Sequence, residues 1–130
     1  MNYFDKKIVI TSCLLAALTI AIGAYGAHGL KELVDAGALN TFETGVRYQM
    51  YHVLALFVLG FAEKIPEATR SWVFWFFIFG IILFSGSIYL LSMKELLSFN
   101  VSFAGPITPI GGLLFIFGWL RLAYGLLTIK

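Results

Sequence analysis

The chain has 130 residues, of which 60% are hydrophobic and only 12% are charged. Soluble domains carry about 25% charged residues, so this chain has too few charges to cover the surface of a soluble globule. A net charge of +2 without any basic run argues against nucleic-acid binding. The single cysteine, Cys13, excludes an internal disulfide, and its apolar surroundings predict a buried, inert thiol.

Apolar segments of membrane-spanning length recur along the chain. A bilayer core takes about 20 helical residues, and the sequence predicts spans at about 8–28, 41–62, 71–92 and 106–127. A spanning helix satisfies its own backbone hydrogen bonds, and no alternation of apolar and polar residues favours strands. The first segment is longer than the core of a signal peptide. The predicted fold is an all-α membrane protein, a four-transmembrane-helix bundle that forms one integral membrane domain over residues 1–130.

The connections between these spans carry charges that predict the orientation. The positive-inside rule places the side richer in lysine and arginine in the cytoplasm. Both termini are therefore predicted to be cytoplasmic, in a protein of the inner (plasma) membrane. Trp72 and Trp75 agree, because they open the third span where an interfacial aromatic belt is expected. The basic residues are Lys6, Lys7, Lys64, Arg70 and Lys130 on the cytoplasmic side, and Lys31 and Lys94 on the other.

Local signals predict where individual helices begin. Asn40 followed by Glu43 resembles a capping box, which would start the second helix near Thr41. Pro106 suits the first turn of the fourth helix. Residues 30–36 have the pattern of a short interfacial helix in the first connection.

Small residues are frequent in the first span. Gly23 and Ala27 are four residues apart, as are Ala17 and Ala21. This spacing lets helix backbones approach closely. The small residues serve either packing against the second helix of the same chain or self-association of two copies of the chain. The sequence does not separate these interpretations.

Polar and ionisable side chains cluster at the start of the second span. Lipid penalises such groups, so the helix face that carries most of them is predicted to point into the bundle. Gln49 lies just outside this face on a helical wheel. The residues on the face are Thr44, Arg47, Tyr48, Tyr51 and His52.

Each member of the cluster has a structural and a functional interpretation. Arg47 is expected to reach toward the outer surface or to pair with Glu43. The two tyrosines suit an interface, and Gln49 suits a bridge between helices. His52 lies near mid-membrane, where it is either a neutral hydrogen-bonding residue or a group that handles protons or binds a ligand.

His28, at the outer end of the first span, is the second histidine. The two histidines differ in depth by about 10 Å, which is awkward for shared metal ligation. No Cys-x-x-Cys or Glu-x-x-His pair supports a metal, and no acidic residue accompanies His52 for nucleophilic catalysis. The sequence therefore predicts no metal, no cofactor and no enzyme activity. Arg121 is expected to reach the cytoplasmic surface or to contact a lipid phosphate.

Four segments resemble a known family across essentially the whole chain. The resemblance is to the small conserved multi-pass inner-membrane proteins of unknown function typified by bacterial YwdK and YgdD. It implies topology and location, supplies no activity, and makes His28, Tyr48 and His52 motif positions. The segments are Gly-Ala-Tyr-Gly-Ala-His-Gly-Leu at 23–30, Thr-Gly-Val-Arg-Tyr-Gln-Met-Tyr-His at 44–52, Ser-Gly-Ser-Ile-Tyr-Leu-Leu at 85–91 and Ile-Thr-Pro-Ile-Gly-Gly at 107–112.

Two functions follow as hypotheses. The first is a structural or accessory component that associates with itself or with another membrane protein. The second is a small carrier, or a lipid- or quinone-binding protein, with a pocket between the first two helices. That pocket is predicted to be lined by His28, Tyr48, Tyr51 and His52. The lipid bilayer is the expected surrounding in both cases.

Overall fold

A computed structural model describes residues 3–130, and this part of the chain is helical without any strand. The all-α fold predicted from the sequence is therefore confirmed. Short 3-10 turns, η1 (Leu30–Glu32) and η3 (Lys94–Leu96), lie in two of the connections. The long helices are α1 (Lys6–Ala27), α2 (Ala36–Phe61), α3 (Glu67–Gly80), α4 (Gly86–Ser92) and α5 (Ala104–Leu127), with a π-helical segment, η2 (Ile81–Ser85), joining α3 to α4.

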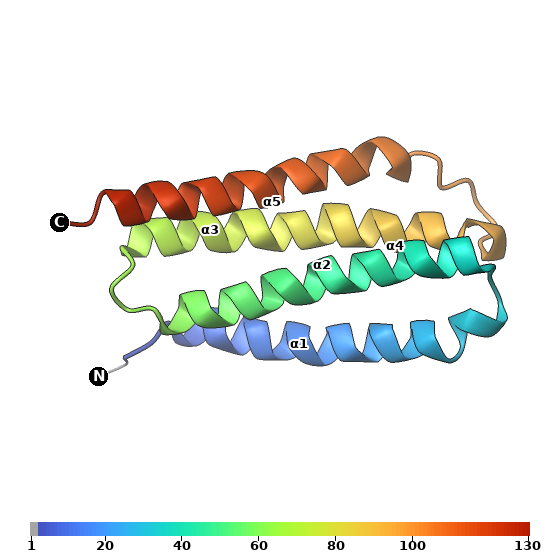
Figure 1. The fold of residues 1–130 in the computed structure, drawn as a ribbon, viewed down its shortest axis with the longest axis horizontal. Coiled ribbons are helices and arrows are strands. Elements are labelled where there is room, and N and C mark those ends of the chain that lie inside the picture. The colour runs from blue at the N-terminus through green and yellow to red at the C-terminus, as the bar shows by residue number, and fades with distance from the viewer. Residues whose placement is uncertain (1–2) are drawn as a thin grey trace.

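Four rods lie side by side and run up and down in chain order (Figure 1). They are α1, α2, the continuous rod of α3, η2 and α4, and α5. α1 packs on α2, α2 packs on η2 and α4, and α5 packs on α3, η2 and α4. The continuous rod from α3 to α4 is therefore the central element that joins the two halves of the bundle. Both termini lie at the same end of the bundle, together with the connection from α2 to α3 (Figure 1).

Three of the predicted spans coincide with helices that are long and apolar enough to cross a membrane. These helices are Lys6–Glu32, Glu67–Ser92 and Ala104–Leu127. The predicted second span, 41–62, falls in α2, which is not among them. The first half of α2 carries Arg47, which lowers the mean hydropathy of a helix that is otherwise of spanning length.

The start of α2 differs from the prediction. Asp35, rather than Asn40, is the N-cap, and its carboxylate accepts a hydrogen bond from the Ala38 amide at 2.8 Å. The capping box predicted from Asn40 and Glu43 therefore lies inside the helix. Aspartate and asparagine cap helices about equally well, and the earlier of the two residues starts this one. The interfacial helix predicted over 30–36 is accordingly reduced to the single turn η1.

Glycines at seven-residue intervals let α5 approach the central rod closely. A Cβ atom at any of them would collide with a neighbour, either the backbone of Phe84, the ring of Phe77 or the side chain of Thr69. Small residues at such contacts allow the backbones of membrane helices to pack against each other. The glycines are Gly111, Gly118 and Gly125.

Burial in α1 is confined to a narrow strip that faces α2. Gly23 and Gly26 lie in this strip, against Val46 and Phe42 of α2. Cys13 is exposed on another side of α1, so the prediction of a buried thiol is wrong. Apolar neighbours imply burial in a soluble protein, whereas on a membrane helix they are equally compatible with a side chain that faces lipid.

Candidate functional site

His52 sits on α2 at the point where α2 approaches α5. The side chain is buried, with 5% of its surface exposed. Its ring stacks on Phe115 with centroids 3.6 Å apart and meets the edge of Phe77 at 4.9 Å. Nδ1 lies 2.7 Å from the Tyr48 carbonyl oxygen, and Nε1–H of Trp119 donates to Nε2 at 3.0 Å.

These contacts define the chemical state of His52. The indole N–H of Trp119 is only a donor, so Nε2 must be the acceptor. The ring proton then lies on Nδ1, which donates to the Tyr48 carbonyl. With both nitrogens engaged, His52 is a neutral residue that joins two helices. The geometry favours the structural interpretation of this residue over proton transfer.

Gln49 forms a second polar contact between helices, one turn closer to the outer end of α2. Its Nε2 donates to Thr19 Oγ1 at 2.8 Å, and its Oε1 accepts from the Tyr89 hydroxyl at 2.7 Å. Thr19 in turn donates to the Leu15 carbonyl at 2.6 Å. The network joins α1, α2 and α4, and the bridge between helices predicted for Gln49 is confirmed.

The inward face of α2 is not the one predicted from the wheel. Tyr48 and Tyr51 are 40% and 54% exposed, and Arg47 is also exposed. Gly45 sets the rotation of the helix, because a Cβ atom at this position would collide with the ring of Tyr89. Tyrosine and arginine can point outward from a membrane helix, since their apolar stems contact lipid while their polar ends reach the interface.

Arg47 points toward the N-terminal end of α2. Its guanidinium donates to Thr44 Oγ1 at 3.0 Å, so within the described chain it engages a hydroxyl in place of the predicted carboxylate of Glu43. Thr44 is itself anchored to the Asn40 carbonyl. This direction is the one expected of an arginine that reaches toward the outer surface.

The predicted pocket between the first two helices does not form from the predicted residues. His28 is exposed at the C-terminal cap of α1, with Nδ1 at 2.9 Å from the Ala24 carbonyl oxygen. His52 instead faces α5, and Tyr51 is exposed beside Tyr48. The two histidines therefore belong to different parts of the bundle.

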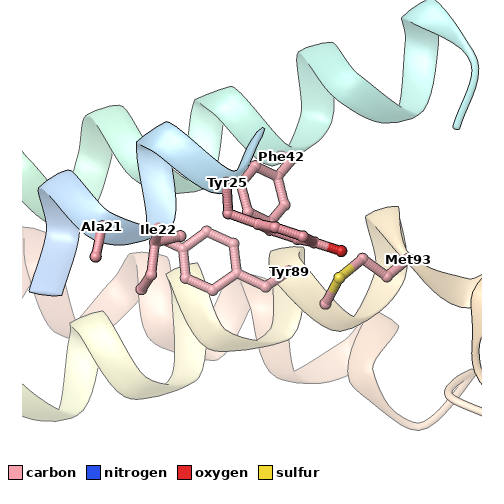
Figure 2. Close-up of a pocket in the computed structure, with 6 residues that line it drawn as sticks. All are labelled: Ala21, Ile22, Tyr25, Phe42, Tyr89 and Met93. Atoms are coloured by element: carbon pink, nitrogen blue, oxygen red, sulfur yellow. The ribbon is translucent and has the colours of Figure 1, made fainter. Parts of the chain in front are cut away.

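A hollow of about 330 Å³ does lie beside α1 and α2, with α4 as its third wall (Figure 2). None of the predicted site residues lines it. Its walls are almost entirely carbon, which gives it no evident chemistry. Over residues 3–130, no three His, Cys, Asp or Glu side chains converge as metal ligands would. The lining residues are Ala21, Ile22, Tyr25, Phe42, Tyr89 and Met93.

Two of the predicted residues, Tyr48 and His52, line a different and larger groove. It has a volume of about 630 Å³ and lies between α2 and α5. Trp119 and Phe115 form part of its α5 wall, and sequence reasoning missed both as partners of His52. Trp119 lies 67 residues from His52 along the chain. No local spacing signals such a contact.

The four segments that carry the family resemblance meet in the half of the bundle that contains the α1–α2 connection (Figure 1). Ser85 donates to the Gly45 carbonyl at 2.7 Å, which links the second segment to the third. Ser87 hydrogen-bonds Thr108 and so links the third segment to the fourth. Gly23, in the first segment, packs against α2. The residues of these four segments thus form contacts between helices rather than a cluster of reactive groups.

Apolar helices with satisfied polar contacts between them define a helical integral membrane protein. The chain belongs to a family of proteins of unknown function (DUF423), whose family model matches residues 22–112. All four segments above lie within this match. The resemblance predicted from the sequence is therefore confirmed.

Relatives from several bacteria are similar over most of their length. The chain is 41% identical over 120 residues to UPF0382 membrane protein SSP2132 of Staphylococcus saprophyticus, covering 92% of this chain and 96% of that one. It is 40% identical to UPF0382 membrane protein YwdK of Bacillus subtilis, covering 90% and 93%. A UPF0382 membrane protein of Haemophilus influenzae is 42% identical, with 82% of each chain covered. No solved structure matches the chain significantly.

Proposed function

We propose that the protein crosses the bacterial plasma membrane four times, with both termini in the cytoplasm. α2 then spans the membrane in addition to the three helices named above. Its inward polar side chains are shielded by α1, α4 and α5. The common end of the two termini supports an even number of crossings (Figure 1). The excess of lysine and arginine at that end supports its cytoplasmic location.

Single-cysteine labelling tests this topology. In a Cys13→Ala background, Asn100→Cys places a thiol in the connection before α5, and Lys64→Cys places one in the connection after α2. A membrane-impermeant maleimide should label the first variant in intact cells and the second only after permeabilisation. The reverse pattern would contradict the proposed topology, either its orientation or the crossing by α2, and labelling of both variants in intact cells would show that the rod from α3 to α4 does not cross.

The function that the geometry supports best is that of an accessory membrane component, not an enzyme, which associates laterally with another membrane protein. One observation carries this proposal: α1 exposes a row of small residues that do not pack against α2. Ala17, Ala21 and Ala24 are exposed, with Ala21 at the edge of the hollow beside α4, while Gly23 and Gly26 pack against α2. The small residues of α1 thus divide between the two uses predicted from the sequence.

The chain contains its own reporter for this face. Cys13 precedes Ala17 by one helical turn and is exposed on the same side of α1. If the partner is a second copy, a short bis-maleimide should join two chains in native membranes, and Cys13→Ser should abolish the product. If the partner is another protein, it should remain bound during purification in mild detergent.

Bulky substitutions test whether the face is used. Ala17→Leu together with Ala21→Leu should release the partner and yield a lone monomer, because leucine separates the helix backbones. Ala123→Leu is the matched control, since Ala123 is an exposed alanine on a different helix, α5. A wild-type protein that purifies only as a monomer, with nothing bound, would refute lateral association.

A further inference from the structure

The groove between α2 and α5 is open to the membrane along its side. Its volume of about 630 Å³ falls within the range of about 300–1,000 Å³ that is common for ligand pockets. α5 packs on the central rod, and α2 packs on α1 and α4, so α2 and α5 leave a furrow where they approach each other. Its walls include Tyr48, Phe84, Pro109, Leu113, Ile116 and Trp119.

The interior of this groove suits hydrocarbon. Its lining is mostly carbon, and the polar groups of His52 and Trp119 are already bonded to each other. A polar ligand placed along these walls would lose its hydration without gaining new hydrogen bonds. Leu113 and Ile116 are each about half exposed, so the α5 wall offers apolar surface that an alkyl chain can cover.

A cation lies one helical turn beyond the groove residue Tyr48. The guanidinium of Arg47 donates to Thr44 Oγ1, and Thr44 precedes Tyr48 by four residues on the same face of α2. Arginine has five N–H donors in a planar fork that matches the oxygens of a phosphate. A neutral hydroxyl engages the group here, which leaves its charge and most of its donors available for an anion.

The depth of Arg47 suits a lipid headgroup. α1 ends at Ala27, and its Gly26 packs against Phe42 of α2, so in a spanning bundle we expect the outer interface near this level of α2. Arg47 is five residues further along α2, or about 7.5 Å deeper by the helical rise. Helical side chains lean toward the N-terminus of their helix. The Arg47 side chain therefore extends from its Cα atom toward the interface and covers most of this distance.

We propose that this groove is a binding site for an anionic phospholipid. The phosphate binds Arg47, and one acyl chain lies along Tyr48, Leu113 and Ile116. The apolar walls accept the chain of any phospholipid, and Arg47 selects one whose headgroup is anionic. The site requires a bundle that spans the membrane, and it is independent of lateral association through α1.

Trp119 provides the reporter for this site because it lines the groove. In a Trp72→Phe/Trp75→Phe background it is the one remaining tryptophan. The full chain is reconstituted in phosphatidylcholine vesicles, and phosphatidylglycerol or phosphatidylcholine brominated near the chain methyl end is added in graded amounts. We expect brominated phosphatidylglycerol to quench Trp119 at a mole fraction roughly fivefold lower, the effect of one basic side chain near the headgroups.

Three variants separate this site from general charge effects. Arg47→Gln should abolish the preference for phosphatidylglycerol, and Arg47→Lys should retain part of it because the charge remains. Gly112→Leu should reduce quenching by both lipids, since Gly112 lines the groove and a larger side chain there would fill it. Far-UV circular dichroism establishes that each variant is folded.

Defined results would overturn the proposal. Equal quenching by the two lipids in the wild-type background would remove selection by charge. A preference that survives Arg47→Gln, or that disappears in Arg121→Gln at the opposite end of α5, would place the anionic site elsewhere. Weak quenching by both lipids that Gly112→Leu leaves unchanged would indicate that a protein segment covers the groove.

Discussion

The Trp119 indole donates its hydrogen bond to Nε2 of His52 across 3.0 Å, and this contact ties α5 to α2. Both groups lie within the apolar thickness of the bundle, where an unpaired donor or acceptor is costly. The ring of His52 is also stacked on Phe115 of the same helix, α5. Of the two interpretations that the sequence allows for His52, the structure therefore favours a neutral residue that joins two helices by a hydrogen bond.

A double-mutant cycle on this pair should reveal a favourable coupling. His52→Leu and Trp119→Phe should each lower the free energy of unfolding by about 1–2 kcal/mol, because each leaves one polar partner unpaired in apolar surroundings. The double variant should lose less than the sum, with a coupling of about 0.6 kcal/mol, as found for hydrogen bonds between membrane helices. Unfolding by dodecyl sulphate in mixed micelles, followed by circular dichroism, measures these values. Additive losses would contradict a direct bond.

Gln49 should be more sensitive to substitution than Tyr89, because it makes two contacts and Tyr89 makes one of them. Gln49→Leu should lower the free energy of unfolding by about 1–2 kcal/mol, and Tyr89→Phe by about 0.6 kcal/mol. Gln49→Glu distinguishes hydrogen bonding from shape, since it keeps the volume and places a carboxyl group in the core. The same unfolding titration applies, and a Tyr89→Phe loss as large as that of Gln49→Leu would be inconsistent with the network.

The positions of the helices were predictable because charged connections separate apolar runs. The start of α2 was not, since Asp35 and Asn40 are both good caps and only the first is used. The spacing of the small residues also predicted close packing. Gly23 meets that expectation, while Ala17 faces away from the chain's own helices.

The candidate site was predicted less well, for a reason specific to membranes. A wheel that sends every polar side chain inward fails for Arg47 and Tyr51, which are exposed on the outside of the bundle. The rotation of α2 depends on close approach at Gly45, which a single helix does not reveal. The partner of His52 is equally hidden, because Trp119 is brought to it by the packing of α5.

Two adjacent glycines on α5 should differ in how much stability the same substitution removes. Gly111→Ala should lower the free energy of unfolding by about 1–3 kcal/mol, because the added Cβ atom collides with the backbone of Phe84 in the π-helical segment. Gly112→Ala should stay within about 0.5 kcal/mol of wild type, since its Cβ atom would lie 3.7 Å from the Phe84 ring, an ordinary contact. The unfolding titration compares them directly. Equal losses would show that α5 does not approach the rod through Gly111.

Arg70 should protect the end of α2 through hydrogen bonds that a simple charge cannot replace. Its Nη1 donates to the Ile65 carbonyl at 3.0 Å and to the Ala62 carbonyl at 3.3 Å, so it satisfies acceptors beyond the last turn of α2. Arg70→Gln should speed amide hydrogen exchange over residues 60–66 and lower the melting temperature. Lys64→Gln removes the same charge from an exposed position at the same end and should change neither. If both variants accelerate exchange equally, the effect belongs to the charge at this end of the bundle and the hydrogen bonds of Arg70 are not its cause.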